Sequence, residues 1–181
     1  MVTKQTEQLP PKESWLSPKI AIRNSPLGGK GMFAIAPIDA GEELVVWGGF
    51  YTSDADKVQE ARQMGRFAVQ WDDELFSIEG RSEDPAFFIN HRCEPNTWMK
   101  NAFTLEASRA IAVGEEITAD YAVWEGNPAY VSKWQCNCGV KTCRGRVTGH
   151  DWERPELQAR YKGHFSPFLN KKIAASQTNL A

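Results

Sequence analysis

The chain has 181 residues, of which 41% are hydrophobic and 24% are charged, and its formal net charge is −2. This composition is typical of a single soluble globular domain with a sizeable core, and the charge argues against a broad nucleic-acid-binding surface. No apolar run approaches the roughly 20 residues that span a bilayer, and residues 1–17 contain no apolar signal region. We therefore expect a flexible N-terminal arm and no membrane partner. The expected location is the cytoplasm, or the nucleus in a eukaryote.

Short apolar or alternating segments predict a mostly β fold with few short helices. Strands are expected at residues 19–23, 32–35, 43–47, 67–71, 75–78, 103–108, 109–113 and 117–121. A helix should begin at Ser53, where Asp56 gives a start like a capping box, and end at Gly65. A second helix is expected at residues 154–161, with a proline in its first turn. Residues 174–181 are expected to be disordered.

The stretch from Phe87 to Asn96 differs from an ordinary loop. It begins with apolar residues and then places Asn90, His91, Cys93 and Asn96 within seven positions. Amide side chains both donate and accept hydrogen bonds, and His and Cys are frequent metal ligands. The density of these residue types directly after an apolar segment indicates a functional loop.

The four cysteines consist of three within eight residues and one far upstream. They are Cys93, Cys136, Cys138 and Cys143. A disulfide between the first two of the cluster would close a strained ring, so the cluster is interpreted as a metal site. Structural zinc takes four nitrogen or sulfur ligands, and Cys93 is the only cysteine left to complete the set, with His91 and His150 as alternatives. Such a site would link the loop at residue 93 to the tail and couple metal binding to folding.

Two further features are compatible with more than one role. Gly28, Gly29 and Gly31 allow positive φ angles and the close approach of a ligand, but they fit neither a P-loop nor a dinucleotide-binding pattern. A plain hairpin turn explains them equally well. Tyr121 ends a predicted strand one residue after Asp120. A core tyrosine with a satisfied hydroxyl is the commonest explanation for such a residue, and a catalytic tyrosine is the alternative.

Together these pieces resemble a SET-domain protein-lysine methyltransferase with a cysteine-rich post-SET tail, over roughly residues 18–148. The motifs that carry the resemblance are residues 29–34 (GKGMFA), 89–96 (INHRCEPN), 114–121 (GEEITADY) and 136–145 (CNCGVKTCRG). They occur in the family's order, although Arg92 stands where the family usually has serine. The resemblance implies a SET-type β-clip in which the Asn90 and Tyr121 segments form a pseudoknot-like crossing. A C-terminal zinc-binding post-SET segment would follow.

The resemblance also divides the chain and assigns roles to its residues. The implied parts are a flexible arm (1–17), a SET domain (18–124), a post-SET segment (125–148) and an extension (149–181) with a short helix and a disordered end. S-adenosylmethionine would be held by Lys30, Gly31, Met32, Phe67, Asn90, His91 and Tyr121. Trp134 and Asn137 would line the adenine pocket. Tyr121 would be catalytic, and one structural zinc ion would be bound by Cys93, Cys136, Cys138 and Cys143.

The implied reaction is transfer of a methyl group to the neutral ε-amine of a lysine in a protein substrate. Free lysine has a pKa near 10.4, so about one in a thousand side chains is neutral at pH 7, and a narrow apolar channel would raise that fraction. Ala119 stands where many relatives carry an aromatic residue that limits how many methyl groups fit. A small residue there leaves room for more than one methyl group unless Phe103 or Trp124 fills the gap.

Two other functions are compatible with parts of the sequence. One is a non-catalytic SET-like module that binds a peptide or the cofactor, although the intact Asn90, His91 and Tyr121 argue against it. The other is a nucleic-acid-binding zinc ribbon that places basic tail residues on phosphates, which the net charge makes unfavourable. A basic protein substrate, such as a histone, is suggested by a group of acidic residues that could equally form a solvated face. They are Asp72, Asp73, Glu74, Glu79, Glu83 and Asp84.

Overall fold

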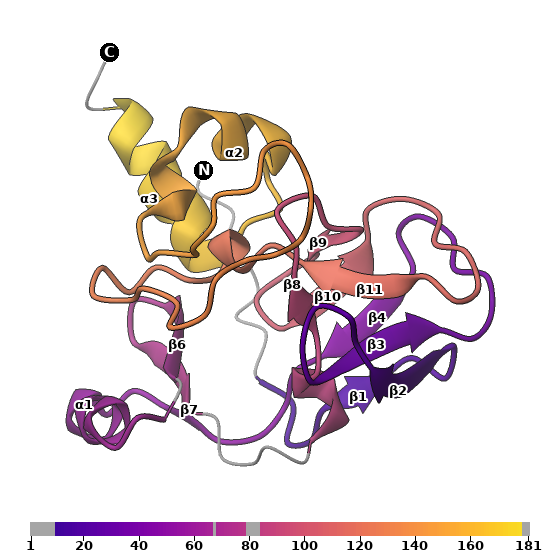
Figure 1. Cartoon of the computed structure of the whole chain (residues 1–181). Coiled ribbons are helices and arrows are strands. Elements are labelled where there is room, and N and C mark those ends of the chain that lie inside the picture. Colours follow the sequence, from indigo (N-terminus) through magenta and orange to yellow (C-terminus); the bar gives the residue numbers. More distant parts are fainter. Residues whose placement is uncertain (1–9, 67, 79–83, 179–181) are drawn as a thin grey trace, which may run out of the picture.

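The computed structural model describes residues 10–66, 68–78 and 84–178. Within these ranges the strands form three small sheets, and most of the helical structure lies at the C-terminal end of the chain (Figure 1). The prediction of a mostly β fold with few short helices is confirmed. Each described helix is too short or too polar to cross a lipid bilayer.

The three sheets are built from short strands that are mostly antiparallel. The first sheet has the order β1 (Trp15–Leu16), β4 (Glu43–Val46), β10 (Thr104–Ala107), β9 (Thr97–Met99). The second has the order β2 (Ile20–Asn24), β3 (Lys30–Ala34), β11 (Glu116–Ala119), β8 (Asn90–His91), and its β11–β8 pair is parallel. The third has the order β5 (Tyr51–Thr52), β7 (Leu75–Ile78), β6 (Ala68–Asp72).

One hydrophobic core joins the first two sheets to the C-terminal segment. Leu44 of β4, Leu105 of β10 and Ile117 of β11 are fully buried in it, together with Leu169 from near the C-terminus. Burial of such side chains contributes about 1.5–3 kcal/mol each. A smaller cluster packs α1 (Ala55–Gln63) against the third sheet. The main core also extends into the third sheet, where Val69 and Trp71 of β6 are buried in it.

The first helix begins close to its predicted start but uses a different cap. Asp54, rather than Ser53, is the N-cap, because its carboxylate accepts hydrogen bonds from the backbone N–H groups of Asp56 and Lys57. Gly65 follows the helix with a φ of 73°, a left-handed conformation that suits glycine and ends the helix as predicted.

Two segments differ from expectation, one at the N-terminal arm and one at the strand expected over residues 109–113. Part of the N-terminal arm is fixed, because β1 pairs with β4 and the backbone N–H of Ser17 donates to the carbonyl oxygen of Leu44 at 2.9 Å. Residues 109–113 do not form a strand. Ile111 makes an isolated bridge with Ile38, and Gly114, with a φ of 85°, then turns the chain towards β11.

The C-terminal extension contains more structure than expected. It folds into η3 (Asp151–Glu153), α2 (Pro155–Arg160) and α3 (Pro167–Thr178). The prediction of α2 is confirmed, whereas residues 174–178, expected to be disordered, belong to α3. This helix packs against the body of the protein so closely that a Cβ atom added at Gly126 would lie 2.8 Å from the Leu169 side chain. Long-range packing of this kind leaves little trace in local sequence.

Candidate active site

The parallel strand pair β8–β11 brings two distant motifs together. Asn90 and His91 of β8 lie opposite Thr118 and Ala119 of β11. The chain continues from β8 into the loop that contains Cys93, and from β11 directly to Tyr121. Residues of the Asn90 segment and of the Tyr121 segment are therefore neighbours, as the resemblance implies.

Asn96 fastens the loop after β8 to β11. Its amide oxygen accepts a hydrogen bond from the backbone N–H of Thr118 at 2.9 Å, and its amide nitrogen donates to the backbone carbonyl of Glu116 at 2.9 Å. The hydroxyl of Thr97 donates to the carbonyl of Thr118 at 2.9 Å. Asn96 is buried, so these bonds satisfy polar groups that water does not reach.

Tyr121 is held at both its backbone and its side chain. It begins η2 (Tyr121–Val123), two residues beyond the end of β11, where a strand was predicted to continue. Its backbone N–H donates to Nδ1 of His91 at 3.3 Å, and its hydroxyl donates to the backbone carbonyl of Ile89 at 2.7 Å. A phenolic oxygen that donates one hydrogen bond can also accept one. The hydroxyl is therefore fixed in position and remains chemically suited to bind an amine.

A buried ion network supports the residue before Tyr121. The carboxylate of Asp120 is fully buried and accepts from both terminal nitrogens of Arg144, one of them at 2.8 Å, and from the hydroxyl of Tyr161 at 3.1 Å. Arg144 also donates to Asp151 at 2.9 Å. Burial opposes the charge of Arg144, but the two carboxylates raise the pKa of its guanidinium group. The network ties β11, the cysteine tail and the C-terminal extension together, and breaking one partner would leave a buried charge uncompensated.

His91 is a buried, neutral imidazole. Burial lowers the pKa of His91 to about 4, although Asp120 opposes this shift. Since Nδ1 accepts from the backbone of Tyr121, the hydrogen-bond pattern assigns the proton to Nε2, which lies 3.4 Å from Sγ of Cys93. His91 thus connects the position of Tyr121 to the cysteine cluster.

The four cysteines gather at one place. The Sγ atoms of Cys93, Cys136, Cys138 and Cys143 all lie within 4.8 Å of one another. A tetrahedral zinc ion with Zn–S bonds of about 2.3 Å requires sulfur atoms roughly 3.8 Å apart, and the pair Cys93–Cys136 is separated by 4.0 Å. The donor set therefore fits zinc. The alternative ligand His150 is exposed and pairs with Glu153.

Burial makes this cluster unfavourable as a set of thiolates without a cation. Burial raises the pKa of the Cys93 thiol to about 11. Cys138 is also buried, but backbone N–H groups at Val140 and Cys93 lower the pKa of its thiol to about 7. A bound divalent metal deprotonates its thiol ligands, which would offset the cost of charging the remaining cysteines.

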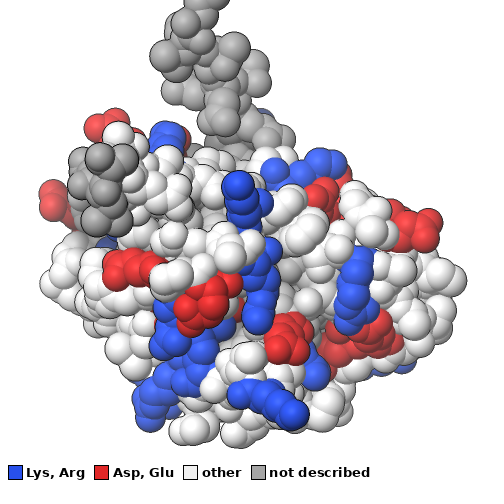
Figure 2. All heavy atoms as spheres, turned by 90° about the horizontal axis from the view of Figure 1, so that it is seen from above, with Lys and Arg blue, Asp and Glu red and all other residues white. Residues whose placement is uncertain are grey.

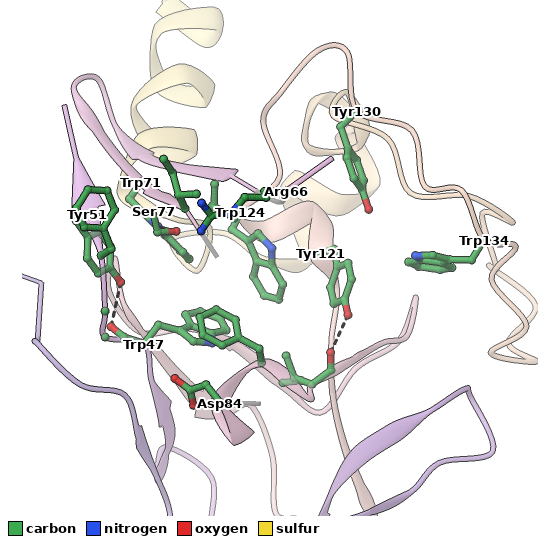
Figure 3. Close-up of a pocket in the computed structure, with 17 residues that line it drawn as sticks. Trp47, Tyr51, Arg66, Trp71, Ser77, Asp84, Tyr121, Trp124, Tyr130 and Trp134 are labelled. Atoms are coloured by element: carbon green, nitrogen blue, oxygen red, sulfur yellow. Dashed lines mark hydrogen bonds between the residues drawn. The ribbon is translucent and has the colours of Figure 1, made fainter. Parts of the chain in front are cut away.

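Two cavities meet at Tyr121. The larger has a volume of about 640 Å³ and the smaller about 270 Å³, and both are lined by Tyr121 and Trp134. Figure 3 shows Tyr121 between Trp134 on one side and the group of Trp71, Ser77 and Tyr51 on the other. The smaller cavity is lined in addition by Leu27, Gly28, Asn90, His91, Gln135, Cys136, Asn137 and Cys138. Tyr121 and Trp134 are the two described residues that line both cavities.

The structure brings together part of the residue set expected around the cofactor. Asn90, His91, Trp134 and Asn137 line the smaller cavity. Lys30, Gly31 and Met32 do not, although the carbonyl oxygen of Lys30 accepts from the amide nitrogen of Asn90 at 3.0 Å. Met32 is fully buried and lines neither cavity. Phe67 lies outside the described residues.

Sequence reasoning missed most of the wall of the larger cavity. Trp47, Tyr51, Trp71 and Tyr130 line it, but in the sequence they resemble ordinary core aromatic residues. Trp124 also lines it, 5.1 Å from Tyr121 between ring centroids, whereas Ala119 is buried in β11. Of the two residues expected to fill the gap beside Ala119, Trp124 lies against Tyr121, and Phe103 packs with Tyr51 and Trp71.

The acidic residues that suggested a basic substrate are partly used within the protein. Lys171 of α3 forms an ion pair with Asp72 at 2.5 Å and lies 3.8 Å from Asp73. Asp84 lines the larger cavity, and Glu79 and Glu83 lie outside the described residues. On the face seen in Figure 2, basic and acidic side chains lie beside one another, an arrangement unlike the continuous basic surface that nucleic acid requires.

Several known proteins are similar to this chain in sequence or in fold. The SET domain family model matches residues 29–122, just over half of the chain. The chain is 30% identical over 137 residues to histone-lysine N-methyltransferase trithorax of Drosophila virilis and, over the same length, to histone-lysine N-methyltransferase 2B of Homo sapiens. Each alignment covers 69% of this chain but only 4% and 5% of those much longer relatives.

The fold resembles that of the methyltransferase domain of human histone-lysine N-methyltransferase SETMAR, with a TM-score of 0.55 and 19% sequence identity. That similarity covers 72% of this chain and 58% of the other. The matched family region contains Asn90, His91 and Tyr121, which line the smaller cavity. From the sequence match and the arrangement of these motifs, we conclude that the chain belongs to the SET-domain family.

Proposed function

We propose that the protein is an S-adenosylmethionine-dependent protein-lysine N-methyltransferase with Tyr121 as its catalytic tyrosine. The observation that carries the proposal is the position of the Tyr121 ring between two cavities. The smaller cavity would hold the cofactor and the larger one the substrate lysine. Methyl transfer needs the two reactants on opposite sides of a narrow junction, so that donor and acceptor atoms align.

The smaller cavity offers groups that suit the proposed cofactor. The amide nitrogen of Asn90 donates to Lys30 and Glu116, while no hydrogen bond to its amide oxygen is found among the described residues. That oxygen can accept a hydrogen bond from the ammonium group of an amino-acid ligand. Trp134 and Asn137 supply an aromatic face and an amide for a purine ring. When bound, S-adenosylmethionine supplies a sulfonium methyl group that a neutral amine can displace.

The larger cavity can prepare a lysine for the reaction. Trp47, Trp124 and Trp134 line it, and the first two are almost fully buried. A lysine placed among these rings loses hydration, which lowers its pKa and raises the fraction of neutral amine. The Tyr121 oxygen can orient that amine while its own proton remains bonded to Ile89. Positioning and desolvation thus supply the rate enhancement, and Tyr121 is not required as a base.

We further propose that the cysteine cluster binds one structural zinc ion. Cys93 belongs to the loop that follows β8, whereas the other three ligands belong to the tail that also supplies Trp134 and Asn137. The ion would therefore hold both sides of the smaller cavity together.

The substrate class is a protein that presents a lysine, and a basic, histone-like protein is favoured by the relatives named histone-lysine methyltransferases. With such a substrate, the protein would act in the nucleus of a eukaryotic cell.

The direct test is transfer of a labelled methyl group from S-adenosylmethionine to lysine in a panel of basic proteins, including histones. Tyr121→Phe removes the hydroxyl that orients the amine, and should reduce transfer about a hundredfold, as for loss of one polar group that stabilises a transition state. Thermal unfolding and zinc content should remain close to wild type. Failure of the zinc-loaded wild type to bind S-adenosylmethionine would contradict the proposal, whereas cofactor binding without transfer to any protein would favour a non-catalytic binding module.

A further inference from the structure

The larger cavity is bigger than one lysine side chain requires. A butylammonium group has five heavy atoms, and at the roughly 30 Å³ that a water molecule occupies, each of them would add up to about 150 Å³. The cavity holds about 640 Å³. Its volume falls in the range of roughly 300–1,000 Å³ that encloses much larger ligands. Most of the cavity is therefore available to another part of the substrate.

The additional volume extends away from Tyr121 along a row of aromatic rings. The ring of Trp124 lies 5.1 Å from Tyr121 and 5.3 Å from Trp47, and Trp47 lies 5.5 Å from Trp71. Trp71 and Tyr51 belong to the third sheet, at the end of the cavity opposite Trp134 (Figure 3). We call the part of the cavity lined by Tyr51, Val69, Trp71 and Ser77 the distal lobe.

Polar groups in and next to the distal lobe already have partners within the protein. The hydroxyl of Tyr51 donates to the carbonyl of Trp47 at 3.0 Å, and the indole N–H of Trp71 donates to the hydroxyl of Ser77 at 2.7 Å. The indole N–H of Trp47 donates to the carbonyl of Ala86 at 2.9 Å. The lobe consequently presents the faces and edges of aromatic rings, together with the methyl groups of Val69.

The charges and the exposed residues around the cavity indicate which kind of substrate side chain the distal lobe would bind. Aromatic rings attract either apolar groups or cations. The four residues that line the distal lobe include no carboxylate that would balance the charge of a cation. Asp84 lines the larger cavity outside the distal lobe, where it accepts hydrogen bonds from Ser14 at 2.7 Å and from the backbone of Ala86 at 2.9 Å. Phe50, which also lines the cavity, is 59% exposed, so an apolar surface leads into it.

We propose that the distal lobe binds a large apolar side chain of the protein substrate, located two positions from the target lysine. This inference rests on the proposed function, because it takes Tyr121 as the site of the lysine amine. In an extended peptide, alternate side chains point to the same side and are separated by roughly 7 Å. The ring of Trp47 lies 5.3 Å from that of Trp124 and 5.5 Å from that of Trp71, so a side chain about 7 Å from a lysine at Trp124 would lie beyond Trp47. Sequence next to the lysine, rather than basic charge alone, then selects the substrate.

Binding of short peptides tests the proposal without requiring turnover. The probes are fluorescent alanine-rich peptides with one central lysine and with Phe, Trp, Leu, Ala or Arg at position −2 or +2. Fluorescence anisotropy is measured with the full chain, zinc-loaded and saturated with S-adenosylhomocysteine, which carries no transferable methyl group. Phe at one of the two positions should tighten binding about tenfold or more relative to Ala, because an aromatic ring becomes buried. Arg at that position should give no such gain.

Two variants locate the effect in the distal lobe. Val69→Phe fills the lobe and should abolish the preference for Phe over Ala. Trp71→Phe enlarges the lobe and should move the preference from Phe towards Trp. The matched control is Val113→Phe, which makes the same substitution at a position that is 60% exposed and does not line the cavity. Thermal unfolding of each variant verifies its fold.

The outcomes separate this inference from the proposed enzyme activity. Equal affinity for all peptides, or no binding of any of them, would overturn the distal lobe as a substrate site. A preference that survives in both lobe variants, or one for Arg over Phe, would do the same. A missing methyl transfer reaction, with the Phe preference and its loss in Val69→Phe intact, would instead contradict only the catalytic function.

Discussion

Burial and hydrogen bonding set the charge of the residues around Tyr121. The carboxylate of Asp120 is paired with Arg144, whereas Glu125 is also buried but has no cation in hydrogen-bond contact among the described residues. Its side-chain oxygen accepts from the backbone N–H of Asn127 at 2.8 Å. Burial raises the pKa of Glu125 to about 7, although that hydrogen bond and the charge of Arg62 oppose the shift. The negative charge of Glu125 is therefore unfavourable in the folded state.

Glu125→Gln should stabilise the protein at pH 8 and reduce its pH dependence. The folded state binds more protons than the unfolded state between about pH 4.5 and 7, so the stability contribution of Glu125 is fully present below pH 4.5 and is lost as the pH rises through 7. The loss amounts to at most roughly 3 kcal/mol. Glutamine keeps the acceptor for Asn127 without the charge. Urea unfolding at pH 5, 6, 7 and 8 measures the change.

Glu60→Gln is the matched control, because Glu60 is exposed on α1. It should change the free energy of unfolding by no more than about 0.5 kcal/mol at any of these pH values. An identical pH profile for the wild type and Glu125→Gln would show that Glu125 is solvated in solution.

At the scale of elements, the β8–β11 pair positions the residues of the candidate site. Each strand is short, and β8 has only two residues, so few backbone hydrogen bonds hold the pair together. The side chains of Asn96 and Thr97 add hydrogen bonds to the backbone of β11. The loop that follows β8 is thus attached to β11 mainly through side chains, which makes their loss costly.

Asn96→Ala should destabilise the fold by about 2–4 kcal/mol. The substitution leaves the backbone N–H of Thr118 and the carbonyl of Glu116 without their buried partner, and each unsatisfied group costs about 1–3 kcal/mol. Chemical denaturation measures the loss. Asn127→Ala, which removes one exposed turn contact to Ala129, should cost about 0.5 kcal/mol or less. Similar losses for the two variants would mean that Asn96 does not anchor the loop.

At the scale of the whole molecule, contacts between distant segments hold the halves of the site together. The cysteine cluster joins the loop at Cys93 to the tail. Arg144 joins that tail to Asp120 and Asp151, and Arg160 of α2 donates to the carbonyl of Cys93 at 2.6 Å. The C-terminal extension therefore supports both Tyr121 and the cysteine cluster, although it lies beyond the matched family region.

Removal of zinc should loosen the tail and with it the cofactor site. We expect a strong chelator to lower the unfolding temperature by about 10 °C or more, and to weaken binding of S-adenosylhomocysteine, because the tail supplies Trp134 and Asn137. Added zinc should restore both properties. Cys93→Ser should lower the measured zinc content below one ion per chain. An unfolding temperature that does not respond to chelation of a zinc-containing sample would contradict a structural role for the ion.

Several features of the fold follow from local sequence. The strands around residues 20–24, 30–34 and 43–46 and helices α1 and α2 were predicted from apolar spacing, turn residues and helix ends. Helix α3 and the pairing of β1 with β4 were not, because both depend on partners far away in the chain. Their residues show no local pattern that requires the observed structure.

The candidate site also combines features that follow from local sequence with features that only the tertiary structure sets. Sequence by itself indicated the cysteine cluster and the Asn90 loop, since ligand spacing and polar residues at the end of a strand are local properties. The proposed role of Tyr121 came from the resemblance to the SET-domain family, because its local pattern equally fits a core tyrosine. Tertiary structure alone decided that Tyr121 lies between two cavities, that Asp120 is held by Arg144 and Tyr161, and that Trp47 and Trp71 line the larger cavity. A tryptophan in a buried strand has the same local sequence pattern whether it faces the core or a cavity, because the opposing surface comes from segments distant in the chain.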